Sequence, residues 1–122
     1  MFRLALLFSV VAVAYDALAA GIARALSISY DTFAILAFVL FFLMGLLAGR
    51  KAHAWTGVLP VAIAALVEAT AGWYVAAAIG PGSVPGATRE WIVYAGLAGA
   101  AYLIVAGAAG VAIAKRIPST TR

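Results

Sequence analysis

Residues 33–49 read FAILAFVLFFLMGLLAG, and none of them carries a charge or a polar side chain. An α-helix rises about 1.5 Å per residue, so a helix of this length nearly spans the roughly 30 Å hydrocarbon core of a bilayer. Three further apolar stretches surround it, at residues 4–26, 57–79 and 91–114. We therefore expect an all-α integral membrane protein with four transmembrane helices.

The composition of the chain also favours a lipid environment. Hydrophobic residues make up 67% of the 122 residues and charged residues only 10%, whereas soluble domains are about half apolar and about a quarter charged. The lipid bilayer is thus the expected main partner. Nucleic acid is not expected as a partner, because the basic residues behind the net charge of +4 form no stripe along the chain.

The links between the apolar stretches are short and favour turns. Residues 27–32 (SISYDT) are rich in helix-capping side chains, with Asp31 as the expected cap of the second helix. Thr56 and Thr88 stand where the third and fourth helices would begin, and residues 80–86 (GPGSVPG) favour a turn between those helices. Each link would therefore join two antiparallel helices.

One domain is the simplest organisation of this chain. We expect it to cover residues 1–117 as a four-helix bundle made of two antiparallel hairpins, followed by a polar tail at 118–122. In an alternative interpretation, Arg3, the apolar residues after it and Ala17-Leu18-Ala19, with the outline of a small-residue cleavage site, form a cleavable signal peptide. We expect the first helix to be retained, because the short link pairs it naturally with the second.

Lysine and arginine are distributed unequally between the two ends of such a bundle. Arg24 and Arg89 fall at one end, and six basic residues fall at the other: Arg3, Arg50, Lys51, Lys115, Arg116 and Arg122. Basic residues accumulate on the cytoplasmic side of membrane proteins. We expect a multi-pass protein of the cell inner (plasma) membrane with its N- and C-termini in the cytoplasm.

Asp16 and Glu68 are the candidate functional residues, because each lies near the middle of a predicted membrane span. An acidic residue at the centre of a transmembrane helix costs about 3 kcal/mol on insertion scales. Small residues at helical spacing accompany each acid, so both carboxyl groups should face protein and not lipid. Gly72, one helical turn after Glu68, is part of this small-residue face.

Two interpretations of these acids stay open. In the functional one, Glu68 and Asp16 bind a proton or a cation, because removal from water disfavours the charged form of a carboxyl group. In the structural one, the acids hold the helices together by hydrogen bonds to polar side chains nearby. The candidate partners are Ser9, Tyr15, Thr70 and Tyr74.

Glycines at helical spacing predict close helix packing. Gly45 and Gly49 form a G-x-x-x-G pattern in the second helix, and Gly96 and Gly107 belong to a mostly small stripe on the fourth. Such residues allow two helix backbones to approach each other. They would serve either packing within the bundle or assembly into a homo-oligomer.

Catalysis and cofactor binding have no support in the sequence. The chain has no cysteine, a single histidine (His53) and no nucleophile, phosphate-loop or metal-ligand motif. We therefore expect a protein that is not an enzyme and holds neither cofactor nor metal.

Two functions fit these observations. The first is a small transporter-like membrane protein that works as a homo-oligomer, with Glu68 and Asp16 as its proton or cation site. The alternative is a non-catalytic accessory or scaffold protein whose small-residue stripes pack against another membrane protein.

Overall fold

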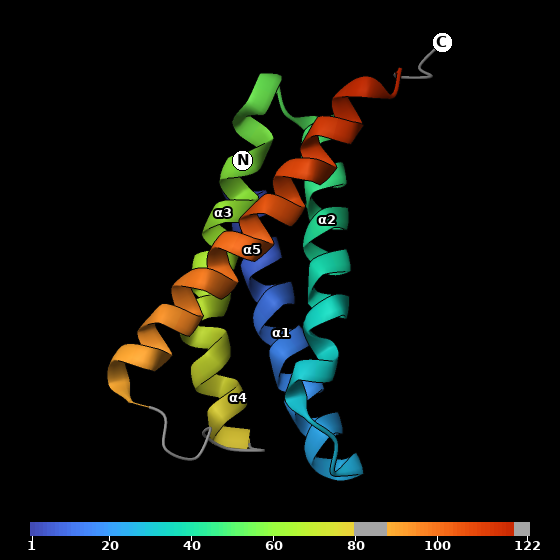
Figure 1. Ribbon diagram of the computed structural model, residues 1–122. Helices are drawn as coiled ribbons and strands as arrows, with labels where there is room; N and C mark the ends of the chain where they lie inside the picture. The colour runs from blue at the N-terminus through green and yellow to red at the C-terminus, as the bar shows by residue number, and fades with distance from the viewer. Residues whose placement is uncertain (80–87, 119–122) are drawn as a thin grey trace.

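The computed structural model describes residues 1–79 and 88–118, and these residues form helices and turns with no strand. Five α-helices follow one another along the chain: α1 (Phe2–Leu26), α2 (Ala34–Lys51), α3 (Val58–Val67), α4 (Trp73–Ile79) and α5 (Arg89–Arg116) (Figure 1). Short 3-10 turns at Tyr30–Phe33 and Ala54–Gly57 lead into α2 and α3. A π-helical turn, Glu68–Gly72, joins α3 to α4.

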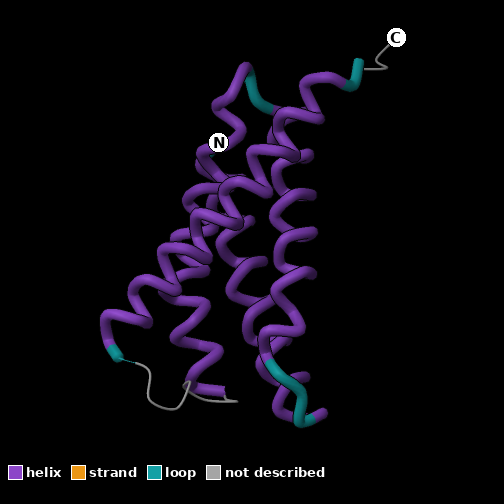
Figure 2. The backbone as a smooth tube through the Cα atoms, viewed as in Figure 1, coloured by secondary structure: helices purple, strands orange, loops and turns teal. Residues whose placement is uncertain are grey.

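These elements form four continuous helical rods (Figure 2). The rods cover Phe2–Leu26, Asp31–Lys51, Ala54–Ile79 and Arg89–Arg116, and each is long and apolar enough to cross a membrane. The prediction of an all-α chain with four such helices is thus confirmed. The predicted boundaries lie within a few residues of the observed ones, because hydropathy marks where a rod can begin and end.

The predicted helix caps were correct at one position and wrong at two. Thr88 caps α5 as expected, since its Oγ accepts a hydrogen bond from the Trp91 N–H at 3.2 Å. Ser29, and not Asp31, caps the turn into α2 by accepting a bond from the Asp31 N–H. Thr56 caps nothing, because the third rod already begins after His53 and the Thr56 hydroxyl donates back to the His53 carbonyl.

Helices that are neighbours in sequence are not the main packing partners. In Figure 1 the chain runs down through α1, up through α2, down through α3 and α4, and up through α5. However, α1 packs mostly against α3, the π-helical turn and α4, whereas α2 packs mostly against α5, and α1 and α2 hardly touch. The first hairpin is therefore a connection in the chain and not a packing unit.

The packing of α2 on α5 depends on glycine. A methyl group at Gly45 would overlap the Gly107 carbonyl, and one at Gly110 would overlap the Phe42 carbonyl. A methyl group at Gly49 would lie 2.8 Å from the Ala114 Cβ. The two backbones thus touch along several turns within one chain, the close approach that small residues permit.

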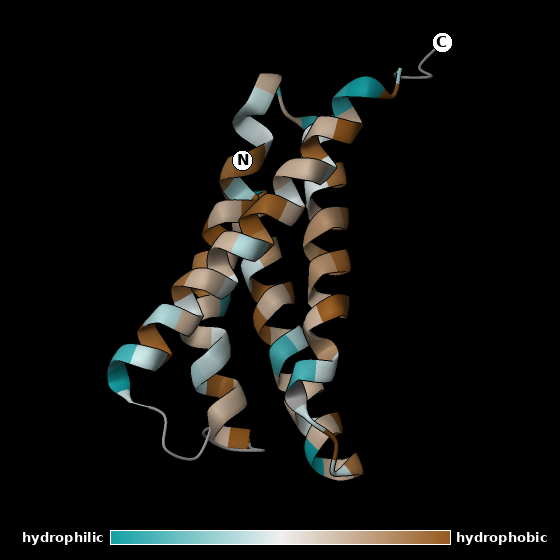
Figure 3. Cartoon of the chain, in the orientation of Figure 1, coloured by the Kyte–Doolittle hydropathy of each residue, from teal (hydrophilic) through white to brown (hydrophobic). Residues whose placement is uncertain are grey.

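Residue sizes are reversed relative to a soluble protein. Six alanines of the core have no exposed surface: Ala12, Ala20, Ala48, Ala64, Ala65 and Ala106. Many large apolar side chains point outwards instead, among them Leu18, Ile35 and Val105. Figure 3 shows that hydrophobic residues predominate along the helices and that hydrophilic residues lie at the two ends of α5. Small residues inside and large apolar residues outside are typical of helices that pack together in lipid.

Candidate cation site

Asp16 lies in the interior of the bundle. The α1 face that carries it is lined by buried alanines, and only 1% of Asp16 is exposed. Its carboxyl group packs directly on the backbone of Gly72, because a methyl group built at Gly72 would overlap Asp16 Oδ2 and lie 3.1 Å from its Cγ. The lack of a side chain at Gly72 therefore makes room for this acid.

Glu68 reaches the same place from the third rod. It begins the π-helical turn and is 8% exposed, and its Cγ lies 3.6 Å from the methyl position at Gly72. The two predicted acids thus meet at a single glycine, although they come from different helices. The structure brings Asp16, Glu68 and Gly72 together.

The π-helical turn also joins Glu68 to Trp73. In a π-helix the backbone bond runs over five residues, and the Trp73 N–H accordingly donates to the Glu68 carbonyl oxygen. Glu68 and Trp73 also line the same cavity. The irregular turn therefore places an aromatic ring beside the acid. Single π-helical turns inside α-helices are frequent at functional sites.

A cavity of about 180 Å³ lies beside the two acids. Its lining contains three acids, Asp16, Asp31 and Glu68, and no lysine, arginine or histidine from the described parts of the chain. Aromatic and small or apolar residues complete the lining: Tyr15, Phe33, Ala34, Ala37, Trp73, Gly99, Tyr102 and Leu103. Every rod of the bundle thus contributes to a cavity lined by carboxyl groups and aromatic rings.

Two of the aromatic side chains are held in place by neighbouring residues. The Tyr15 hydroxyl donates to the Phe33 carbonyl at 2.5 Å, which links α1 to the start of α2 where the two helices otherwise hardly touch. The Tyr102 ring of α5 packs against Phe38 of α2, with 4.9 Å between the ring centroids and a 45° tilt. These two contacts connect the cavity walls on three rods to one another.

The other polar side chains proposed as partners of the acids lie elsewhere. The Ser9 hydroxyl donates to the Ala5 carbonyl and the Thr70 hydroxyl to the Leu66 carbonyl, each at 2.8 Å within its own helix. Tyr74 is 79% exposed. Of the four candidates, Tyr15 alone is among the residues that line the cavity.

The sequence reasoning also missed several residues of the cavity. Gly99 and Tyr102 are three residues apart and share a face of α5, a spacing that could have suggested them. Asp31 and Phe33 give no such signal, because their position depends on the fold of the turn before α2.

Gly96 is a predicted packing residue, but its contact is an ordinary one. A methyl group there would lie 3.6 Å from the Ala69 carbonyl.

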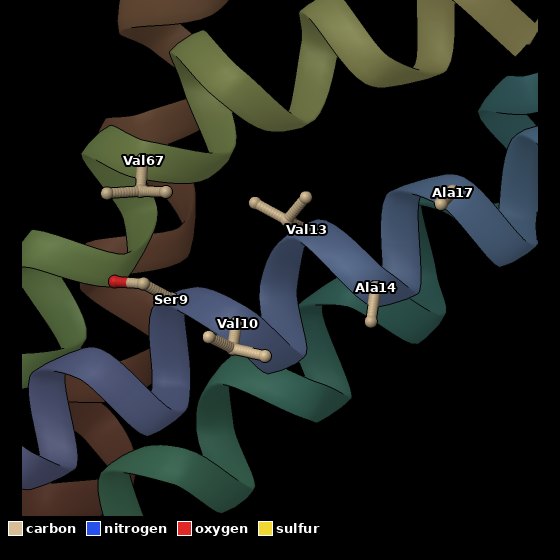
Figure 4. A pocket seen from close by; sticks show the side chains of 6 residues that line it. All are labelled: Ser9, Val10, Val13, Ala14, Ala17 and Val67. Atoms are coloured by element: carbon tan, nitrogen blue, oxygen red, sulfur yellow. The ribbon is translucent and has the colours of Figure 1, made fainter.

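A second hollow is an open groove of about 440 Å³ on the outside of α1. Figure 4 shows the side chains around it, five from α1 and Val67 from α3. They are Ser9, Val10, Val13, Ala14, Ala17 and Val67. The groove is apolar, since the hydroxyl of Ser9 is already bonded within its helix.

Basic side chains of the described residues lie near helix ends and do not line the cavity. Arg24 of α1 donates to the Ile79 carbonyl at the end of α4, at 2.8 Å, and Lys115 of α5 donates to the Ala52 carbonyl after α2. Positive charge is favourable near the last carbonyls of a helix.

The described residues, 1–79 and 88–118, contain no group of three histidine, cysteine, aspartate or glutamate side chains that could hold a metal ion.

No protein-family model, curated protein or solved structure matches the chain.

Proposed function

We propose that this chain is a small transporter-like membrane protein in which Asp16 and Glu68 bind a proton or a cation inside the cavity. One observation carries the proposal. Two buried acids from different helices line the same cavity, and no basic side chain from the described ranges lines it with them.

Electrostatics supports this function over a purely structural role. A charged carboxyl group in the bilayer interior is costly and needs a partner, a proton or water. Two acids in one cavity also repel each other when both are charged. A mobile positive charge, either a proton or a cation, would remove both penalties. A site of this kind can bind a proton or a cation and release it again.

The location of the cavity fits movement across a membrane. Asp31, which lines it, is exposed at the end of the bundle opposite Arg50, Lys51 and Lys115. With the basic end in the cytoplasm of an inner-membrane protein, the cavity would open towards the outside. Because a cavity of this size reaches only part of the way through the bundle, we expect a homo-oligomer to complete the path.

Flux measurements on Glu68→Gln test this function. The purified chain is reconstituted into vesicles that hold a pH-sensitive dye and a proton gradient, and collapse of the gradient is followed after addition of NaCl, KCl or tetramethylammonium chloride. We expect the wild type to collapse the gradient with at least one of these salts, and Glu68→Gln and Asp16→Asn to behave like vesicles without protein.

Glu90→Gln is the matched control. Glu90 lies exposed in the first turn of α5, and its substitution removes the same charge at a position outside the cavity. Its flux should equal that of the wild type. Flux through Glu68→Gln at the wild-type rate would end the transporter proposal.

The groove on α1 favours a second candidate, a non-catalytic accessory or scaffold protein. Its valines and alanines offer a surface on which a helix of another membrane protein could pack. Purification in mild detergent from native membranes separates the two functions. A stoichiometric foreign membrane protein that is lost in Ala14→Trp would support the accessory role, whereas self-assembly alone would support transport.

A further inference from the structure

We propose that the ligand of the cavity is a small organic cation of the ammonium or guanidinium class. This inference rests on the function proposed above and adds the chemical class of the ligand. It depends on the aromatic walls, which a site for a proton alone would not need.

The rings of the lining are suited to recognise such a cation. Tyr15, Phe33, Trp73 and Tyr102 come from four different parts of the chain and line one cavity. The face of an aromatic ring attracts a cation, most strongly when water is excluded, and quaternary ammonium groups are recognised in cages of this kind. The carboxyl groups of Asp16 and Glu68 supply the balancing charge.

The chemistry and the size of the cavity argue against other ligands. Metal ions such as Ca²⁺ take six to eight oxygen ligands, and the described residues hold no group of three acids or histidines arranged for one. The volume of about 180 Å³ is below the roughly 300–1,000 Å³ of drug-sized sites. It has room for about six groups of the size of a water molecule. A cation such as tetramethylammonium is of this size.

The three acids also indicate a route for such a cation. Asp31 is exposed at the end of the bundle, whereas Glu68 and Asp16 are buried within it, with exposed fractions of 8% and 1%. A cation that enters beside Asp31 would therefore remain next to a carboxyl group as it loses water. Negatively charged lining of this kind raises the local concentration of cations.

Trp73 offers a direct optical test, because it lines the cavity together with Glu68. The other two tryptophans, Trp55 and Trp91, are exposed and do not line the cavity. Trp55→Phe with Trp91→Phe leaves Trp73 as the single reporter. In lipid nanodiscs at constant ionic strength, tetramethylammonium chloride should change its fluorescence saturably, and sodium chloride should not.

Tyr102→Leu tests the role of the rings in this background. Loss of one cation–π contact should weaken tetramethylammonium binding by about 2- to 30-fold, whereas Tyr102→Phe, which keeps the ring, should weaken it less than Tyr102→Leu. Tyr94→Leu is the matched control, because Tyr94 is on the same helix, 74% exposed and outside the cavity. It should leave binding unchanged.

The possible outcomes distinguish this inference from the function on which it rests. If tetramethylammonium gives no saturable change, or if Tyr102→Leu binds it like Tyr94→Leu, the organic-cation inference is wrong. The transporter proposal still stands in that case if flux with NaCl or KCl depends on Glu68. Both proposals fail if neither fluorescence nor flux responds to any of these cations in a Glu68-dependent way.

Discussion

Gly72 determines how the two acids approach each other. Asp16 and Glu68 are far apart in the chain. They can approach each other only because one helix has no side chain at the point of contact. Any Cβ at position 72 would occupy the space of the Asp16 carboxyl group. Because the Asp16 Cγ would lie only 3.1 Å from that Cβ, the whole carboxyl group, and not Oδ2 alone, would have to shift.

Gly72→Ala should therefore lower the free energy of unfolding by about 1–3 kcal/mol, as expected for overpacking of a tight interior. Gly21→Ala is the control, because a methyl group at Gly21 of α1 would meet nothing within 4 Å. It should be neutral or stabilise α1 by up to about 1 kcal/mol. Unfolding in detergent micelles with increasing denaturant measures both, and equal midpoints for the two variants would show that Asp16 does not rest on Gly72.

At the scale of the elements, helix positions could be predicted but packing partners could not. The four rods follow from hydropathy, which is a local property of each stretch of sequence. The pairing of α2 with α5 is not local, because α1 and α5 both carry small residues on several faces and either could pack on α2. Gly110 illustrates this difficulty: it packs on Phe42 as closely as Gly45 packs on Gly107, yet its place in a glycine- and alanine-rich stretch does not single it out.

The π-helical turn was likewise beyond prediction from the sequence. Residues 68–72 (EATAG) have ordinary helical propensities, and one extra residue in a turn leaves no mark on hydropathy. The sequence therefore identified Asp16 and Glu68 from their cost in lipid. It missed Trp73, because the turn that carries it to Glu68 changes the register of the helix.

Gly110→Ala tests the interface of α2 and α5. The added methyl group would overlap the Phe42 carbonyl, so the helices must separate and lose contacts along several turns. We expect a loss of about 1–3 kcal/mol in unfolding free energy. Gly99→Ala on the same helix meets nothing within 4 Å and should unfold like the wild type. The interface described here would be wrong if Gly110→Ala were as stable as Gly99→Ala.

For the whole molecule, the orientation in the membrane decides which way the cavity faces. The basic residues in the last turns of α2 and α5 gather at one end of the bundle, and Asp31 lies at the other. From the bias of lysine and arginine we expect the Asp31 end, and with it the opening of the cavity, to face the outside.

The lack of cysteine makes this orientation simple to measure. Thr32→Cys and His53→Cys introduce single thiols at exposed positions at opposite ends of the bundle. In intact cells, a maleimide that cannot cross the membrane should label Thr32→Cys, whereas His53→Cys should react after permeabilisation only. The reverse labelling pattern would show that the cavity opens towards the cytoplasm.

The central claim is that Asp16 and Glu68 exchange protons with the solution from inside the bilayer. Infrared difference spectra of the protein in lipid, recorded between acidic and neutral pH, test it through the carbonyl band of protonated carboxyl groups. We predict that Asp16→Asn and Glu68→Gln each remove part of this band, whereas Glu90→Gln keeps the part that the two buried acids contribute. Spectra of Asp16→Asn and Glu68→Gln that match the wild type would contradict the claim.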